Sequence, residues 1–140
     1  MSATIHAGCV AIDGRGVLIA GASGRGKSDL ALRLIDRGAR LVSDDYTLLQ
    51  DMRGRLVASS PPTIAGTLEI RGVGLVEFEA LAAARVCLLV DLDAPPERLP
   101  EPRPASFLGL AVPALGLDAL EASAAIKVET ALRLFGLPAT

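Results

Sequence analysis

A glycine-rich octapeptide near the N-terminus constrains the fold more than any other stretch of the chain. Residues 21–28 have the sequence GASGRGKS, which satisfies the phosphate-loop pattern GxxxxGK[ST] at every position. The apolar run 17–20 before it predicts a buried strand, and apolar residues at helical spacing over 29–37 predict the helix after it. A strand, this loop and a helix in this order predict an α/β domain built around a phosphate-binding turn.

The residue types in this loop suit a polyanion. Glycines let the backbone wrap closely around phosphates, and successive N–H groups with the positive end of the next helix favour negative charge. The pattern predicts that Lys27 reaches the β- and γ-phosphates and that the Ser28 hydroxyl binds Mg²⁺. The predicted nucleotide-binding residues are Gly21, Ala22, Ser23, Gly24, Arg25, Gly26, Lys27 and Ser28.

The composition favours a single domain over residues 1–140 and argues against two classes of partner. Net charge is −2 and the basic residues are dispersed, so nucleic-acid binding is disfavoured. No apolar run approaches the roughly 18 residues that cross a membrane, and no leader segment is apparent, so we expect a cytoplasmic protein. Cys9 and Cys87 lack metal-ligand spacing and are expected to be buried free thiols.

Periodicity and turn residues predict the remaining elements. Five prolines between residues 94 and 104 predict a stiff, exposed loop. A last helix is predicted to start at Asp118 as N-cap, with Glu121 completing a capping box, and to end at Gly136. The predicted strands are residues 4–12, 17–20, 40–43, 46–50, 55–59 and 86–90.

Several side chains compete for the roles that phosphoryl transfer adds to nucleotide binding, a second metal ligand and a proton acceptor. Asp44 and Asp45 follow a short strand, and neighbours on an extended chain point to opposite sides, which predicts different roles for them. Asp91 also ends an apolar strand, and periodicity does not separate it from this pair. Glu69 lies in a glycine-flanked segment, and His6 matters only if its strand runs beside the acidic pair.

These motifs together resemble the catalytic domain of HPr kinase/phosphorylase, which acts on a serine of the phosphocarrier protein HPr. Four stretches carry the resemblance, in this order: HAGCV, GASGRGKSD, RGARLVSDD and LEIRGVG. The resemblance implies an α/β phosphate-loop fold with a mixed β-sheet flanked by helices, similar to the nucleotide-binding part of phosphoenolpyruvate carboxykinase. It also implies ATP and Mg²⁺ as cofactors, an HPr-type phosphocarrier as partner, and a homo-oligomer, namely a hexamer.

The resemblance further implies a role for each candidate. Ser28 and Glu69 would hold Mg²⁺, and Lys27 would contact the phosphates. Asp45 would accept the proton of the substrate serine in the kinase direction and donate one when phosphoserine is cleaved. Asp44 and His6 match the supporting acidic and histidine positions, which leaves Asp91 without a catalytic role.

Two features depart from the family pattern. The match begins within the first ten residues, so the usual N-terminal domain is expected to be absent. The family has a glycine-arginine-asparagine turn after a Val-Pro pair, whereas Val112-Pro113 is followed here by ALGLD. That arginine would stabilise transferred charge, so its loss bears on rate and direction. Two alternatives therefore stay open: a regulatory nucleotide-binding module with weakened catalysis, and a small-molecule kinase.

Overall fold

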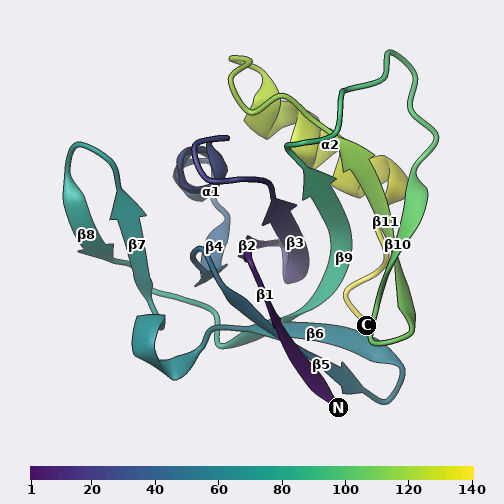
Figure 1. Cartoon of the computed structure of the whole chain (residues 1–140), viewed down its shortest axis with the longest axis horizontal. Coiled ribbons are helices and arrows are strands. Elements are labelled where there is room, and N and C mark those ends of the chain that lie inside the picture. The colour runs from purple at the N-terminus through teal and green to yellow at the C-terminus, as the bar shows by residue number, and fades with distance from the viewer.

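A mixed nine-stranded sheet organises the protein, for which the computed structural model describes residues 1–140 (Figure 1). Its centre is the pair β3 (Arg15–Ala20) and β9 (Ala83–Asp91), which run parallel and end with Ala20 opposite Asp91. Both strands are aliphatic runs, as expected of strands that are covered on both faces. The phosphate loop therefore follows directly from a central strand of the sheet.

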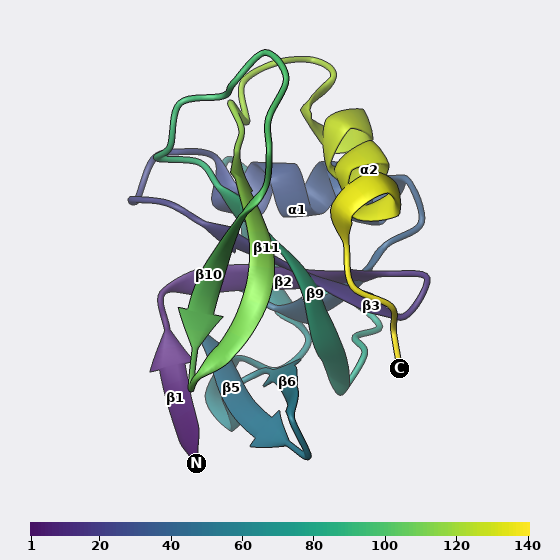
Figure 2. The same ribbon diagram turned by 90° about the vertical axis from the view of Figure 1, so that its right-hand side faces the viewer.

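The remaining strands continue the sheet on both sides of this pair, in the order β1-β5-β6-β9-β3-β2-β4. Strand β6 pairs antiparallel with the start of β9, and β11 pairs parallel with its end on the same side, with β10 beyond it. The sheet divides at this point and curls (Figure 2). The bounds are β1 (Ser2–Ile5), β2 (Ala7–Ile12), β4 (Arg40–Ser43), β5 (Thr47–Met52), β6 (Arg55–Ser59), β10 (Arg103–Phe107) and β11 (Leu110–Gly116).

Two helices, α1 (Lys27–Asp36) and α2 (Ala124–Phe135), pack on the same face of the sheet (Figure 2). Alternation along β3 directs Val17 and Ile19 toward the helices and Leu18 toward the opposite face. A second apolar cluster fills that opposite face inside the curl. The predicted α/β class with a mixed sheet is confirmed, with both helices on one face.

A separate hairpin, β7 (Thr67–Ile70) and β8 (Gly74–Glu77), projects from the body of the molecule after a short 3₁₀ turn at Pro62–Ile64 (Figure 1). Neither this hairpin nor the β10–β11 pair was predicted. Glycines in the first and prolines in the second hide the strand pattern. Pro104 is nevertheless accommodated, because β10 lies at an edge of the sheet, where a missing N–H costs little.

Two predicted elements are wrong in their bounds. The strand predicted over residues 4–12 is interrupted at His6, so that β1 pairs with β5 while β2 pairs with β3 and β4. The last helix begins at Ala124 instead of directly after Asp118. The Asp118 carboxylate instead accepts the N–H of Leu120 at 2.9 Å in a local turn, and the Glu121 carboxylate pairs with Lys127 at 2.8 Å.

Neither α1 nor α2 combines the length and the hydropathy that a membrane crossing requires.

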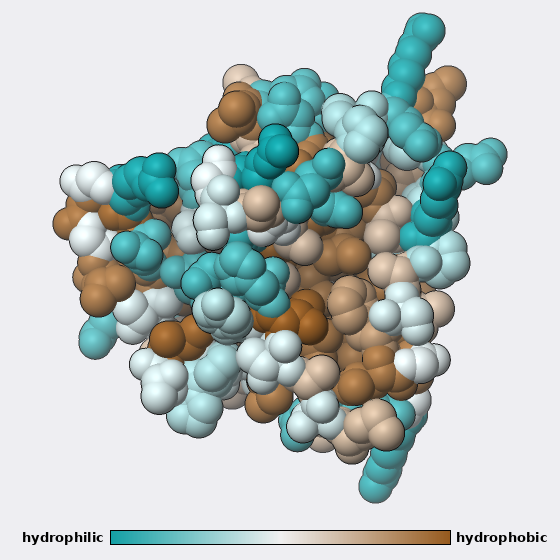
Figure 3. All heavy atoms as spheres, in the orientation of Figure 1, coloured by the Kyte–Doolittle hydropathy of each residue, from teal (hydrophilic) through white to brown (hydrophobic).

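On the other side of the sheet from the helices, apolar residues that are only partly buried adjoin the second cluster: Ile5, Ala20, Leu81, Ala105, Phe107, Leu108, Leu110 and Ala114. Figure 3 shows apolar surface in the middle and right of its view, bordered by hydrophilic side chains.

The two cysteines are free and fully buried, as predicted, on strands β2 and β9. Burial raises the pKa of the Cys9 thiol to about 12, and burial also raises the pKa of the Cys87 thiol above its usual value. Both therefore stay protonated and shielded at neutral and mildly alkaline pH.

We expect neither thiol to react with iodoacetamide in the native protein at pH 8, and both to react within minutes once the protein is unfolded in guanidinium. Mass spectrometry of the alkylated protein provides the measurement. Rapid labelling of Cys9 under native conditions would contradict the burial of this strand.

Candidate active site

The order of the strands brings the predicted groups to one edge of the sheet. Strands β3 and β4 both run antiparallel to β2, which lies between them, so their carboxyl ends point the same way. The phosphate loop follows β3 and the acidic pair Asp44-Asp45 follows β4. His6 precedes β2 and so lies at the same edge. Three segments that are distant in the sequence thus converge.

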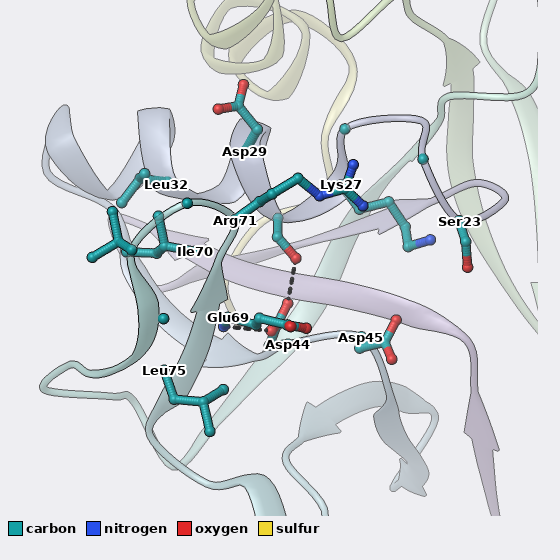
Figure 4. A pocket seen from close by; sticks show the side chains of 16 residues that line it. Ser23, Lys27, Asp29, Leu32, Asp44, Asp45, Glu69, Ile70, Arg71 and Leu75 are labelled. Atoms are coloured by element: carbon teal, nitrogen blue, oxygen red, sulfur yellow. Dashed lines mark hydrogen bonds between the residues drawn. The ribbon is translucent and has the colours of Figure 1, made fainter.

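A pocket of about 850 Å³ opens at this edge, between the loop, the start of α1 and the β7–β8 hairpin (Figure 4). Its volume lies in the range of small-molecule sites. Four of the predicted residues lie outside its wall: Gly21, Ala22, Arg25 and His6. The predicted residues that line it are Ser23, Gly24, Gly26, Lys27, Ser28, Asp44, Asp45 and Glu69.

The phosphate loop contains a buried ammonium group, that of Lys27, which is hydrogen-bonded to the loop backbone. Gly26 has φ +89°, a left-handed conformation that only glycine adopts readily, and it precedes the first residue of α1. Lys27 is only 9% exposed, and its ammonium donates to the carbonyl oxygen of Gly21 at 2.6 Å. It forms no ion pair within the chain. A shielded ammonium whose partner is a neutral carbonyl is well suited to receive an anion.

Asp44 joins the loop to the hairpin. Its carboxylate accepts one hydrogen bond from the Ser28 hydroxyl at 2.8 Å and another from the backbone N–H of Glu69 at 3.0 Å (Figure 4). Because the Ser28 hydroxyl donates to Asp44, its oxygen lone pairs remain available to a cation. One carboxylate therefore orients both residues that are predicted to bind the metal.

Asp45 contacts a different partner from Asp44, as we predicted for two neighbouring residues on an extended chain. Its carboxylate lies 2.8 Å from Nε2 of His6, and both side chains are substantially exposed, at 55% and 40%. The centroid of the Tyr46 ring lies 5.0 Å from the centroid of the His6 ring. Asp45 has φ +64°, which is uncommon for a residue with a side chain and is often found at functional sites.

The pocket is rich in negative charge. Carboxylates of Asp29, Asp44, Asp45 and Glu69 line it, against the cations of Lys27 and Arg71. Triphosphate would meet repulsion here unless a divalent cation accompanied it. The polar lining thus suits a metal-nucleotide complex better than a free nucleotide.

Arg71 was missed as a site residue, although it lies in the quoted LEIRGVG stretch beside Glu69. It comes from the turn of the hairpin and extends along the pocket toward Lys27 (Figure 4). The apolar end of the pocket, formed by Leu32, Ile70 and Leu75, was missed as well. No signal in the sequence placed α1 opposite this hairpin.

Asp91, the rival acidic candidate, lies outside the pocket, and its carboxylate accepts the backbone N–H of Asp93 at 2.9 Å. The segment that lacks the family arginine continues as strand: residues 114–116 of β11 pair with β9. Residues 114–118 contribute nothing to the wall of the pocket. Arg71 is the only arginine among the residues that line the pocket.

Comparisons with known proteins converge on one family. The family model described as "HPr Serine kinase C-terminal domain" matches residues 1–87, which include His6, the loop, both aspartates and Glu69. The HPr kinase/phosphorylase of Clostridium tetani is 46% identical over 77 residues, and that of Clostridium acetobutylicum is 48% identical over 77 residues. Each alignment covers 55% of this chain and 25% of the relative. The chain thus spans about a quarter of the length of these curated relatives.

A solved structure extends the likeness to nearly the whole chain. The structure titled "Hpr(Ser) kinase/phosphatase from Coxiella burnetii" superposes with a TM-score of 0.82 at 32% sequence identity. The superposition covers 94% of this chain and 88% of that chain. The strands and helix beyond residue 87, which the family model does not match, are therefore also part of a shared fold.

Proposed function

The chain belongs to the HPr serine kinase C-terminal domain family, and on that premise we propose that it transfers the γ-phosphate of ATP to a serine of an HPr-type phosphocarrier protein. One observation carries the proposal. The loop lysine, the Ser28 hydroxyl and the carboxylates of Asp44, Asp45 and Glu69 all line one pocket. Phosphoryl transfer needs this combination of phosphate binding, oxygen donors for a metal and a proton acceptor.

Asp45 is the proton acceptor in this proposal. Its carboxylate is exposed at the pocket, where a hydroxyl on a protein surface can approach it. His6 holds one carboxylate oxygen at 2.8 Å, which leaves the other free to accept the serine proton. In the reverse direction the same carboxyl group would return a proton to the serine oxygen.

Mg²⁺ fits the donor set. The Ser28 hydroxyl and the Glu69 carboxylate are oxygen ligands of the kind that Mg²⁺ prefers, and no three carboxylate, imidazole or thiol groups lie close enough to enclose a cation alone. That is typical of Mg²⁺ bound through one or two carboxylates plus substrate phosphates. When bound, the metal would neutralise charge on the transferred group.

Lys27 and the loop N–H groups would bind the phosphates of the nucleotide. Their positive charge is fixed in place before the nucleotide arrives, so little reorganisation is needed during transfer. Arg71 is placed to contribute charge that the arginine missing after Val112-Pro113 would otherwise supply.

The same missing arginine supports a second candidate, a regulatory module that binds ATP and transfers phosphate poorly. Lys27, Ser28 and Glu69, which are predicted to bind phosphate and metal, line the pocket, whereas residues 114–118 bring no cation to it. Binding and transfer must therefore be measured separately.

The test is transfer of labelled γ-phosphate from ATP to purified HPr, with Mg²⁺ or with EDTA. We expect a labelled serine only in the presence of Mg²⁺. ATP binding without transfer to HPr would favour the regulatory module, and transfer to a metabolite instead of HPr would indicate a small-molecule kinase. Removal of the phosphoryl group from phosphoserine-HPr is measured separately, as the dephosphorylation reaction.

Location and assembly complete the proposal. We propose a cytoplasmic protein, because ATP and a phosphocarrier of the HPr type would be met there. We also propose a homo-oligomer, with a hexamer as the expected form. The partly buried apolar residues on the face of the sheet opposite the helices support self-association, since such surface is normally covered in solution. Analytical ultracentrifugation tests the assembly.

A further inference from the structure

A contact between the phosphate loop and the segment that follows β9 has no part in the proposed function. The Asp93 carboxylate accepts the backbone N–H of Ala22 through both oxygens, at 2.9 and 3.1 Å. It also lies 3.2 Å from Nε of Arg25. None of Ala22, Arg25 and Asp93 lines the pocket, so these bonds do not belong to its wall.

Asp93 is itself held firmly at the end of the central strands. The N–H of Leu92 donates to the carbonyl of Ala20 at 2.8 Å, which extends the parallel pairing of β3 and β9 by one step. The N–H of Asp93 donates to the Asp91 carboxylate at 2.9 Å. A Cβ on Gly21 would lie 3.0 Å from that of Leu92, so the loop and this segment are in close contact.

We propose that Asp93 is a positioning residue that anchors the first half of the phosphate loop to the end of β9 and so holds the loop ready for ATP. The inference rests on the proposed function only in that the loop binds a nucleotide. Glycine-rich loops are costly to order, and a loop that is ordered beforehand binds its ligand more tightly.

Arg25 has a second role in this arrangement. The Asp93 carboxylate brings negative charge close to a loop that must receive a polyanion. Arg25 lies between Gly24 and Gly26 in the loop, and its guanidinium neutralises that charge. The ion pair is largely exposed, so its direct contribution to stability is small, and its effect is on the field at the loop.

The test compares Asp93→Ala, which removes the acceptor for Ala22, with Asp93→Asn, which keeps a neutral acceptor. We expect Asp93→Ala to raise the KM for ATP about tenfold with kcat within about twofold, because Asp93 does not touch the reacting atoms. Asp93→Asn should rescue most of this loss. Arg25→Ala should raise KM about threefold, and in the Asp93→Asn background it should have no further effect. Glu97→Ala, which removes an exposed carboxylate from the proline-rich segment that follows Asp93, is the matched control.

The same variants are titrated with a fluorescent ATP analogue in the absence of HPr, so that the anchor is tested even if no transfer to HPr occurs. Parent-like affinity in Asp93→Ala would overturn the anchor, and so would equal losses in Asp93→Ala and Asp93→Asn. If Asp93→Ala does not fold, hydrogen exchange of the parent decides the matter. The anchor requires the Ala22 amide to exchange slowly without nucleotide, and exchange as fast as that of Ser23 would contradict it.

Discussion

Replacing Asp45 by asparagine is expected to lower kcat for transfer to HPr by about 10³-fold, while the affinity for ATP stays within about threefold. The substitution removes the proton acceptor and little else. Asparagine matches the shape of aspartate and tolerates the left-handed backbone conformation at φ +64°, so the variant should fold normally. Its side-chain oxygen can still accept a hydrogen bond from His6.

The measurement is single-turnover transfer from labelled ATP, alongside nucleotide titration. Asp51→Asn is a matched control, because that carboxylate accepts the N–H of Gly54 in the β5–β6 turn, remote from the pocket. Transfer by Asp45→Asn at the parent rate would eliminate Asp45 as the acceptor. A comparable loss of ATP affinity would mean instead that Asp45 acts in binding.

Replacing Asp44 by alanine should have the next largest effect, a loss of about 100-fold in kcat/KM together with a higher Mg²⁺ requirement. Two hydrogen bonds disappear at once, those from the Ser28 hydroxyl and the Glu69 N–H, and each is worth about 1.5–3 kcal/mol to a charged acceptor. The hairpin that carries Glu69 would lose its link to the phosphate loop. Both predicted metal ligands would then be less well oriented.

Activity is measured as a function of free Mg²⁺ at saturating ATP. Asp44→Asn should fall between the parent and Asp44→Ala, since its amide can accept one of the two hydrogen bonds. Asp36→Ala removes an exposed aspartate at the end of α1 and is the control. An unchanged Mg²⁺ requirement in Asp44→Ala would show that this carboxylate does not organise the metal ligands.

Much of the site was predictable because its chemistry is local. The phosphate loop, the strand before it and the helix after it lie within about twenty consecutive residues, and their conformations depend on near neighbours. The acidic pair was predicted with two separate roles, and the structure gives its members separate partners. The assignment of catalysis to Asp45 and of Mg²⁺ to Ser28 and Glu69 stays a prediction.

The errors arose where tertiary contacts outweigh local signals. Asp118 and Glu121 have the spacing of a capping box, yet Asp118 accepts the Leu120 N–H in a turn. Leu117 and Ala119 are buried in the helix-side core, which commits this stretch to packing before α2 begins. At His6 a regular alternation continues in the sequence, but the chain there passes from pairing with β5 to pairing with β3 and β4.

The phosphate-binding loop and the kinds of side chain available for transfer could be predicted from the amino-acid sequence, because glycine conformations and functional groups are properties of single residues. Which of these groups meet depends on the three-dimensional fold. His6 and Asp45 are 39 positions apart and touch because β2 runs antiparallel to both β3 and β4. Asp93 reaches Ala22 across 71 positions because β9 ends beside β3. Strand order is set by packing of the whole sheet, which no short stretch of the chain encodes.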